Sequence, residues 1–338
     1  MAPRPLIRLA RRGLSLGLSL LAIALAIFGL LSLAPGDPLA RMPLTLPPEV
    51  RAAMREAMGL DAPWPTRLAL WLRQALIVEP LVLCDTLFGT SWAEDAPRLI
   101  SWHSRTPVMG LIADRLPQTL RLMGLSYALG LACALPLGLW QAHRHRSAAD
   151  HATTALTMTA YALPPFVVAL LLIWVFSITL GWLPSGYDNS LRITDAASLG
   201  TEIRQLILPV AVLALQITAQ LTRHLRASAI EVLDTDHIRT ARAKGLGPRA
   251  LLTGHVLRHA MIPVVTIVAL GLPQIVGGAI ITEQIFAING IGHLLISSIH
   301  AGDLPVVQTI TLLVAVLVVL ANLLADATYR WLDPRLTG

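Results

Sequence analysis

Six stretches of the sequence lack a charged residue for long enough to cross a lipid bilayer. A transmembrane helix needs about 20 consecutive, mainly apolar residues to span the hydrocarbon core. The third stretch is longer than one span needs, so we expect it to include a turn at membrane level near its outer end. The pattern predicts an all-α membrane protein with six transmembrane helices. The six stretches are Gly13–Leu33, Leu122–Trp140, Ala152–Trp182, Gln205–Thr222, Ala260–Thr282 and Leu304–Leu324.

The composition agrees with this interpretation. Apolar residues make up 55% of the 338-residue chain and charged residues only 14%, whereas soluble domains carry about 25% charged residues. The net charge of +6 could suggest nucleic acid as a partner. The basic residues instead flank the apolar stretches, as membrane topology requires. We therefore expect membrane lipid and no nucleic acid as a partner.

The first apolar stretch follows Arg4, Arg8, Arg11 and Arg12, an arrangement that secretory signal peptides share. The apolar core of a signal peptide usually runs about 7–15 residues. The uncharged run here contains 21 residues. We therefore interpret it as a first transmembrane helix that is not cleaved.

The placement of lysine and arginine predicts the orientation. With the N-terminus inside, the inner segments are residues 1–12, 141–151, 223–259 and 325–338, and they hold more than half of the 26 basic residues. The outer segment 34–121 is also basic, but segments of this length cross membranes largely regardless of charge. Both termini are therefore expected to be cytoplasmic.

The long outer segment is expected to be partly ordered. Residues Glu49–Met58 follow two prolines and precede Gly59, which predicts a short helix. A second, amphipathic helix is predicted where apolar residues recur at helical spacing. These are Leu68, Trp71, Leu72 and Ala75.

The sequence contains none of the motifs expected of an enzyme active site. Cys84 and Cys133 form no C-x-x-C pair, so neither a metal centre nor a disulfide framework is predicted. A phosphate-binding loop needs Gly-Lys followed by Ser or Thr, but Lys244 is the only lysine and precedes Gly and Leu. Hydrolase signatures such as G-x-S-x-G and H-E-x-x-H are absent too. We expect no catalytic residue, cofactor or metal.

The inner loop Glu231–Pro263 has the most informative pattern. Good helix formers are followed by a break at Gly245-Leu246-Gly247-Pro248, where Pro248 suits the first turn of a new helix. The loop is predicted to be two short helices joined by a tight turn. Its small residues would let it enter a groove on another protein; contact with anionic lipid is the alternative. The small residues are Ala241, Ala243 and Gly245.

This loop resembles a known family. Arg239-Thr240-Ala241, with Gly245 and later Pro263, is similar to the cytoplasmic EAA loop of binding-protein-dependent ABC importer permeases, closest to the dipeptide/oligopeptide/nickel branch. Further segments resemble that branch in the order of its motifs. They are Leu33–Pro38, Met58–Asp61, Leu87–Ser91, Thr106–Val108, Leu116–Leu120, Thr282–Phe286, Gly290–Gly292 and Leu332–Arg335.

The sequence departs from the branch at three places. Arg239 stands where the acidic residue that names the EAA loop would be, as is usual in this branch, and Asn289-Gly290 replaces a usual Pro-Gly. Residues Trp92–Arg105 resemble an insertion between two motifs that normally lie closer.

The resemblance implies a type I ABC importer permease (MetI-like) fold in a bacterial inner membrane. It implies a first helix with a large periplasmic loop over residues 1–115, a permease core over 116–329 containing the EAA coupling loop 223–259, and a cytoplasmic tail over 330–338. The implied partners are a second homologous permease, two ATPase subunits and a periplasmic substrate-binding protein. Peptide is the expected substrate, with nickel chelates and glutathione as alternatives within the branch. The implied ATPase-contacting residues are Asp236, Arg239, Thr240, Ala241, Arg242, Lys244 and Gly245.

Polar residues inside the apolar stretches are candidates for the solute pathway, because polar groups at membrane depth face protein or water. Interhelical hydrogen bonding is the alternative, and we favour it. Glu283 and Asp326, at span ends, are expected to be interfacial. The candidate pathway residues are Tyr127, Tyr161, Gln216, Gln220 and Gln274.

Two other classes of membrane protein fit the sequence less well. A transporter driven by an ion gradient would need ionisable residues in mid-span, and all six stretches lack them. A scaffold or receptor without transport would not need the small-residue, Gly-Pro inner loop.

Overall fold

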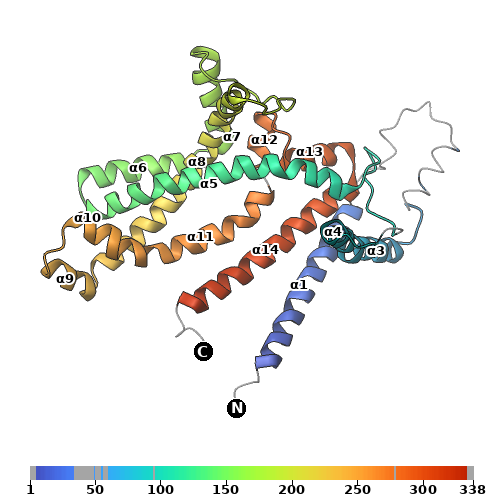
Figure 1. Cartoon of the computed structure of the whole chain (residues 1–338), viewed down its shortest axis with the longest axis horizontal. Helices are drawn as coiled ribbons and strands as arrows, with labels where there is room; N and C mark the ends of the chain where they lie inside the picture. Colours follow the sequence, from blue (N-terminus) through green and yellow to red (C-terminus); the bar gives the residue numbers. More distant parts are fainter. Residues whose placement is uncertain are drawn as a thin grey trace. The chain divides into compact units, whose positions relative to one another are not determined.

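The structure is a computed structural model that describes residues 5–33, 49, 55, 60–93, 96–277 and 279–332. Helices dominate this part of the chain, and it contains no strand beyond an isolated bridge between Ile100 and Pro107 (Figure 1). Of the helix predicted over Glu49–Met58, only Glu49 and Arg55 belong to the described residues. The chain divides into two compact units, which we describe separately.

Apolar helices of membrane-spanning length occur where the sequence predicts them. Five are long enough alone among the described residues, and a bent helix pair brings the total to six if the pair is one span. The predicted all-α fold is therefore confirmed. The five spans are Leu14–Leu33, Val108–His143, Ala196–Leu233, Pro248–Gly271 and Leu304–Leu323.

The third predicted stretch is broken differently from our expectation. Helix α6 (Ala148–Ala162) and the helix that begins with α7 (Pro165–Leu172) and ends with η2 (Ile173–Thr179) are bent by 100°. We expected a turn near the outer end of the stretch, but the break comes at Leu163 and Pro164. Two consecutive prolines explain the position, because neither can donate the backbone hydrogen bond that would continue α6.

The first unit contains residues Met1–Leu116 and Leu294–Val319. Its helices are α1 (Pro5–Leu33), α3 (Trp64–Arg73), η1 (Gln74–Val78), α4 (Glu79–Phe88), the start of α5 (Val108–His143), most of α13 (Ile291–Ala301) and the start of α14 (Leu304–Leu332). The predicted amphipathic helix is confirmed as α3, which buries Trp71. The ring centroid of Phe28 on α1 lies 5.5 Å from Trp64 and 5.6 Å from Trp71.

Two buried carboxylates fix the irregular segment of the first unit. Glu79 accepts hydrogen bonds from the Arg98 guanidinium and the Leu99 backbone, both at 3.0 Å. Asp303 accepts from the Ser101 hydroxyl and, at 3.0 Å, from the backbone N–H of Trp102. The Trp92–Arg105 segment is thus attached to α4 and to the residue just before α14.

The second unit contains residues Pro117–His293 and Leu320–Gly338. Its central element is α8 (Ala196–Leu233), which begins with a capping box formed by Asp195 and Ser198. Helices α6, α7, α9 (Asp236–Ala243), α11 (Leu257–Gly277) and α12 (Ile280–Ile285) all contact it. Figure 1 shows α6 and the second half of α5 running alongside α8.

Glycine permits the close approach of α5 and α8. A Cβ added to Gly130 would lie 2.6 Å from Cγ2 of Ile217, and one added to Gly138 would lie 3.0 Å from Cδ2 of Leu225. Small residues at such contacts let membrane helices pack backbone to backbone. Leu225 is fully buried in the core that also contains Ile238 of α9.

Candidate coupling surface and polar residues of the spans

The inner loop folds as two short helices joined by a tight turn, as its sequence predicts. Helix α9 covers Asp236–Ala243, and α10 covers Pro248–Leu251 with Pro248 at its first position. From α10 the chain continues through η3 (Leu252–Val256) into α11 without a break. Helix α10 is therefore the start of the helix that continues as α11, whereas α9 is a short helix separated from α8 by Asp234 and Thr235.

The turn after α9 is a Schellman motif that requires glycine. The backbone N–H of Gly245 donates to the carbonyl of Arg242 at 3.0 Å, and that of Leu246 donates to Ala241 at 3.4 Å. Gly245 has a φ of +82°, in the left-handed region that glycine adopts without a steric cost. Open space surrounds it, so the constraint on this residue is its backbone conformation.

Helix α9 has one face buried in its own unit. Ile238 is fully buried and Ala241 is 7% exposed, both in a core built from α5, α8 and α11. Leu246 packs against the same core. Any movement of α9 must therefore be transmitted directly to the helices that it packs against, because packed interiors deform little.

The opposite face of α9 and the following turn are exposed and polar. The guanidinium of Arg239 lies 3.1 Å from the carboxylate of Asp236, one turn earlier on the helix. Of the predicted contact residues, only Ala241 is buried, so its small size serves packing inside this chain. The exposed ones are Asp236, Arg239, Thr240, Arg242, Lys244 and Gly245.

The candidate pathway residues are spread over α5, α6, α8 and α11, with Gln216 and Gln220 both on α8, and no hydrogen bond joins any two of their described side chains. Tyr127 on α5 donates to the Gly271 carbonyl of α11 at 3.3 Å. Tyr161 is exposed, with the Arg223 guanidinium 5.1 Å from its ring centroid, a cation–π arrangement. Gln220 is partly buried. The side chain of Gln274 lies outside the described residues.

The side chain of Gln216 forms hydrogen bonds to backbone carbonyls at the break between α6 and α7. Its Nε2 donates to the carbonyl of Ala160 at 3.0 Å and to that of Leu163 at 2.9 Å. In a continuous helix the Ala160 carbonyl would bond the N–H of residue 164, but Pro164 has none. The amide therefore satisfies backbone acceptors that the two prolines leave free.

Sequence reasoning missed an ion pair between α6 and α8. Asp150 is fully buried and accepts two hydrogen bonds from Arg226, at 2.7 and 2.8 Å. It also accepts from the backbone N–H of Arg146 at 3.0 Å. The spacing Ser147-x-x-Asp150 is a helix-start pattern and could have marked Asp150, since Ser147 caps α6. No sequence signal indicates Arg226 as its partner.

Glu283, which we expected at a span end near the membrane interface, is buried in the interior of the second unit. Its side chain is fully buried and accepts from the Thr119 hydroxyl at 3.0 Å and the His293 backbone at 2.9 Å. Burial raises the pKa of this carboxyl. Gly290 and Gly292 pass so close to it that side chains there would collide with Glu283. The segments Thr282–Phe286 and Gly290–Gly292 therefore pack around a buried hydrogen-bond network centred on Glu283. Asp326, also expected to be interfacial, has its side chain outside the described residues.

Together, the apolar helices and the exposed inner helix pair define a multi-span membrane protein. Residues 134–338 match the family described as the binding-protein-dependent transport system inner membrane component, and residues 6–123 match the N-terminal model of the same family. The chain belongs to this family, which confirms the resemblance found in the sequence. The chain is therefore a protein of the inner membrane.

Curated relatives cover nearly the whole chain. It is 39% identical over 321 residues to the oligopeptide transport system permease protein AppB of Bacillus subtilis, covering 94% of this chain and 95% of that protein. It is 35% identical over 320 residues to a putative peptide permease protein of Brucella ovis, covering 94% of each chain. Both relatives are described as permeases.

A solved structure has a similar fold. A chain of the MetNI methionine ABC transporter, in inward-facing conformations, aligns with a TM-score of 0.52 at 18% identity. The alignment covers 66% of this chain and 96% of that chain. This likeness concerns the fold alone, and it confirms the expected importer permease fold.

Proposed function

We propose that this chain is one of two permease subunits of an ATP-driven importer of short peptides, and that α9 is its docking surface for an ATPase subunit. The observation that carries the proposal is the two-sided character of α9. One face is buried against α8 and α11, while the other presents Asp236, Arg239 and Arg242 to solvent. A helix built in this way can receive a force from a partner and pass it to the spans.

The coupling mechanism follows from this geometry. Partner ATPase subunits would close on ATP and move the docked loops together, so that the spans rotate and expose the pathway alternately to the two sides. Because Ile238 and Ala241 anchor α9 in the core, the loop would move with α8 and α11 as one body. We propose contacts through Asp236, Arg239, Thr240, Arg242, Lys244 and Gly245, and leave out Ala241 because it is buried.

The substrate and the assembly are part of the proposal. The relatives' descriptions name oligopeptide and peptide transport, so peptide is the substrate class we propose here. A single permease encloses half of a pathway, so we propose a second, homologous permease, two ATPase subunits and a periplasmic binding protein. Both termini are proposed to be cytoplasmic, with residues 116–329 forming the transport core.

Purification with partners tests the assembly. The tagged chain would be extracted from its host in mild detergent and the proteins that accompany it identified. We expect a second six-span permease and ATPase subunits. A charge reversal, Arg239→Glu with Arg242→Glu, should remove the ATPase and leave the second permease bound. Arg192→Glu with Arg73→Glu is a matched control, because both residues are exposed and neither belongs to α9. Recovery of the chain alone in several detergents would contradict the proposal.

A further inference from the structure

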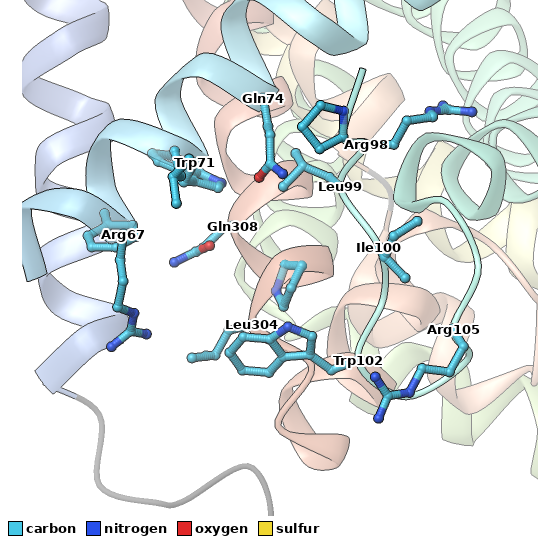
Figure 2. Close-up of a pocket in the computed structure, with 14 residues that line it drawn as sticks. Arg67, Trp71, Gln74, Arg98, Leu99, Ile100, Trp102, Arg105, Leu304 and Gln308 are labelled. Carbon is cyan, nitrogen blue, oxygen red and sulfur yellow. The ribbon is translucent and has the colours of Figure 1, made fainter. Parts of the chain in front are cut away.

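A cavity of about 480 Å³ lies in the first unit, bounded by α1, α3, η1, the 97–105 segment and the start of α14 (Figure 2). The volume falls in the range of about 300–1,000 Å³ that is usual for small-molecule sites. Six residues of the Trp92–Arg105 segment contribute to its lining: Pro97, Arg98, Leu99, Ile100, Trp102 and Arg105. The coupling surface and the candidate pathway residues use none of its lining.

The cavity is positively charged. Its 14 lining residues include Arg67, Arg98 and Arg105 and no acidic residue. Arg98 is neutralised by Glu79, 3.0 Å away. Neither Arg67 nor Arg105 forms a salt bridge with any acid in the described part of the chain. Figure 2 shows these two arginines on opposite sides of the cavity, with Trp102 between them.

Unused hydrogen-bond donors also line the cavity. Trp71 is only 4% exposed, and its Nε1 is buried without an acceptor. A buried indole N–H normally has a partner. Figure 2 shows Gln74 and Gln308 extending toward the same space as Trp71, from η1 and α14 respectively. Within the described residues, the site thus combines two cations that have no acidic partner with a donor that lacks an acceptor, which is the complement of an oxyanion.

The cavity lies at the level where spans end. Phe28 is close to the C-terminal end of the span Leu14–Leu33, and Leu304 is the first residue of the span Leu304–Leu323. Tryptophan is enriched at such membrane–water boundaries, and Trp64, Trp71 and Trp102 all belong to this region of the first unit. A phospholipid brings an anionic head group to this boundary while its acyl chains lie beside apolar side chains.

The insertion is held rigidly enough to form a site. Arg105 adopts a φ of +58°, a conformation uncommon for residues other than glycine that persists only where the surroundings impose it. A short hairpin does so: Ser101 N–H donates to Thr106 at 2.9 Å and Arg105 N–H donates to Ser101 at 3.1 Å. Asp303 holds the tip of this hairpin by accepting from Ser101, Trp102 and His103.

We infer that this cavity binds the phosphate head group of an anionic phospholipid, with Arg67 and Arg105 facing the charge and Trp71 donating a hydrogen bond. The apolar part of the lipid would follow α1 and α14 into the bilayer. The inference does not depend on the transported substrate or on the docking of the ATPase.

Lipid titration of the purified full-length chain tests the inference. Native mass spectrometry in mild detergent would compare phosphatidylglycerol with phosphatidylcholine. We expect the wild type to prefer phosphatidylglycerol about tenfold, and Arg67→Gln with Arg105→Gln to abolish this preference. Arg73→Gln with Arg192→Gln removes the same charge outside the cavity and should retain it. Trp71→Phe keeps the ring but removes the donor, and should weaken phosphatidylglycerol binding several-fold.

Three results would overturn the inference. Equal binding of the two lipids by the wild type would mean that the site does not recognise charge. Competition by soluble glycerol phosphate at the lipid's own concentration would assign the site to a free phosphate ester. Unchanged lipid binding in the Arg67→Gln, Arg105→Gln variant, together with loss of a co-purifying protein, would assign these arginines to a protein contact. Thermal unfolding of each variant checks that it remains folded.

Discussion

Arg226 on α8 donates two hydrogen bonds, 2.7 and 2.8 Å long, to the carboxylate of Asp150, which is fully buried near the start of α6. The two residues join the helix before the Pro164 break to the helix that leads into α9. Removing one partner of a buried ion pair leaves an uncompensated charge, which costs about 3–5 kcal/mol. The pair is therefore a test of how the second unit is held together.

We predict that Arg226→Met lowers the stability of the protein by about 3 kcal/mol or more, measured as thermal or denaturant unfolding in detergent. Asp150→Asn added to Arg226→Met should recover most of the loss, because the charge is then absent. Arg223→Met is the matched control, since Arg223 is exposed on the same helix and its cation–π contact with Tyr161 is worth about 0.5–1 kcal/mol. Equal losses from the two single variants would contradict the prediction.

Gly245 and Gly247 differ in backbone conformation and provide a matched pair. Gly245 has a φ of +82° and Gly247 a φ of −66°, and both have open space around the Cβ position. Gly245→Ala should strain the Schellman turn by about 1–2 kcal/mol and reduce ATP-driven uptake several-fold. Gly247→Ala should behave like the wild type. Uptake into reconstituted vesicles and the amount of chain in the membrane are the two measurements.

A charged replacement gives a stricter test of the same turn. Gly245→Asp should uncouple ATP hydrolysis from transport while the chain still inserts into the membrane. Reduced membrane insertion of this variant would mean that the turn is needed for folding, and the coupling role of Gly245 would be refuted.

Gln216 distinguishes a structural from a transport role for polar residues in the spans. Gln216→Leu removes the amide that donates to the carbonyls of Ala160 and Leu163, and a carbonyl left without a partner away from water costs about 1–3 kcal/mol. We expect a lower unfolding midpoint in detergent. Gln220→Leu, four residues along the same helix, should have little effect on stability. A Gln216→Leu variant with normal stability and altered peptide selectivity would instead assign this residue to the solute pathway.

Local sequence patterns predicted the features that depend on local chemistry. The apolar stretches predicted the spans because their length must match the bilayer. Gly245 and Pro248 predicted the α9–α10 turn because glycine permits a left-handed backbone conformation and proline fixes φ at a value suited to the first turn of a helix. The periodicity that includes Trp71 predicted α3. Family resemblance supplied the fold, which no periodicity specifies.

Pairings between distant residues could not be predicted in this way. Asp150 and Arg226 are 76 residues apart, and Ser101 and Asp303 are 202 apart. In the sequence, each of these residues has the features of an ordinary exposed polar residue, and only the tertiary structure brings it to its partner. The same holds for Glu283: its position at a span end did not indicate that the tertiary structure would bury its side chain against Thr119 and Gly290.

The ionisation of Tyr187, in the loop between η2 and α8, predicts how the stability of the fold depends on pH. Burial, with the hydrogen bond to Glu202 at 2.6 Å, raises the pKa of its hydroxyl to about 12. The unfolded chain loses this proton near the ordinary tyrosine pKa of about 10. Between these values the folded state binds more protons, so stability is complete below about pH 10 and declines as pH rises toward 12.

We therefore expect the unfolding free energy to fall by about 1 kcal/mol between pH 9 and pH 11. Tyr187→Phe should reduce this dependence, whereas Tyr161→Phe, which changes an exposed tyrosine, should leave it unchanged. Denaturant unfolding in detergent at the two pH values measures the slope, and absorbance at the tyrosinate band follows the ionisation directly. If Tyr187→Phe retained the full slope, another group would have to titrate in this range, and the Tyr187–Glu202 contact would not be its source.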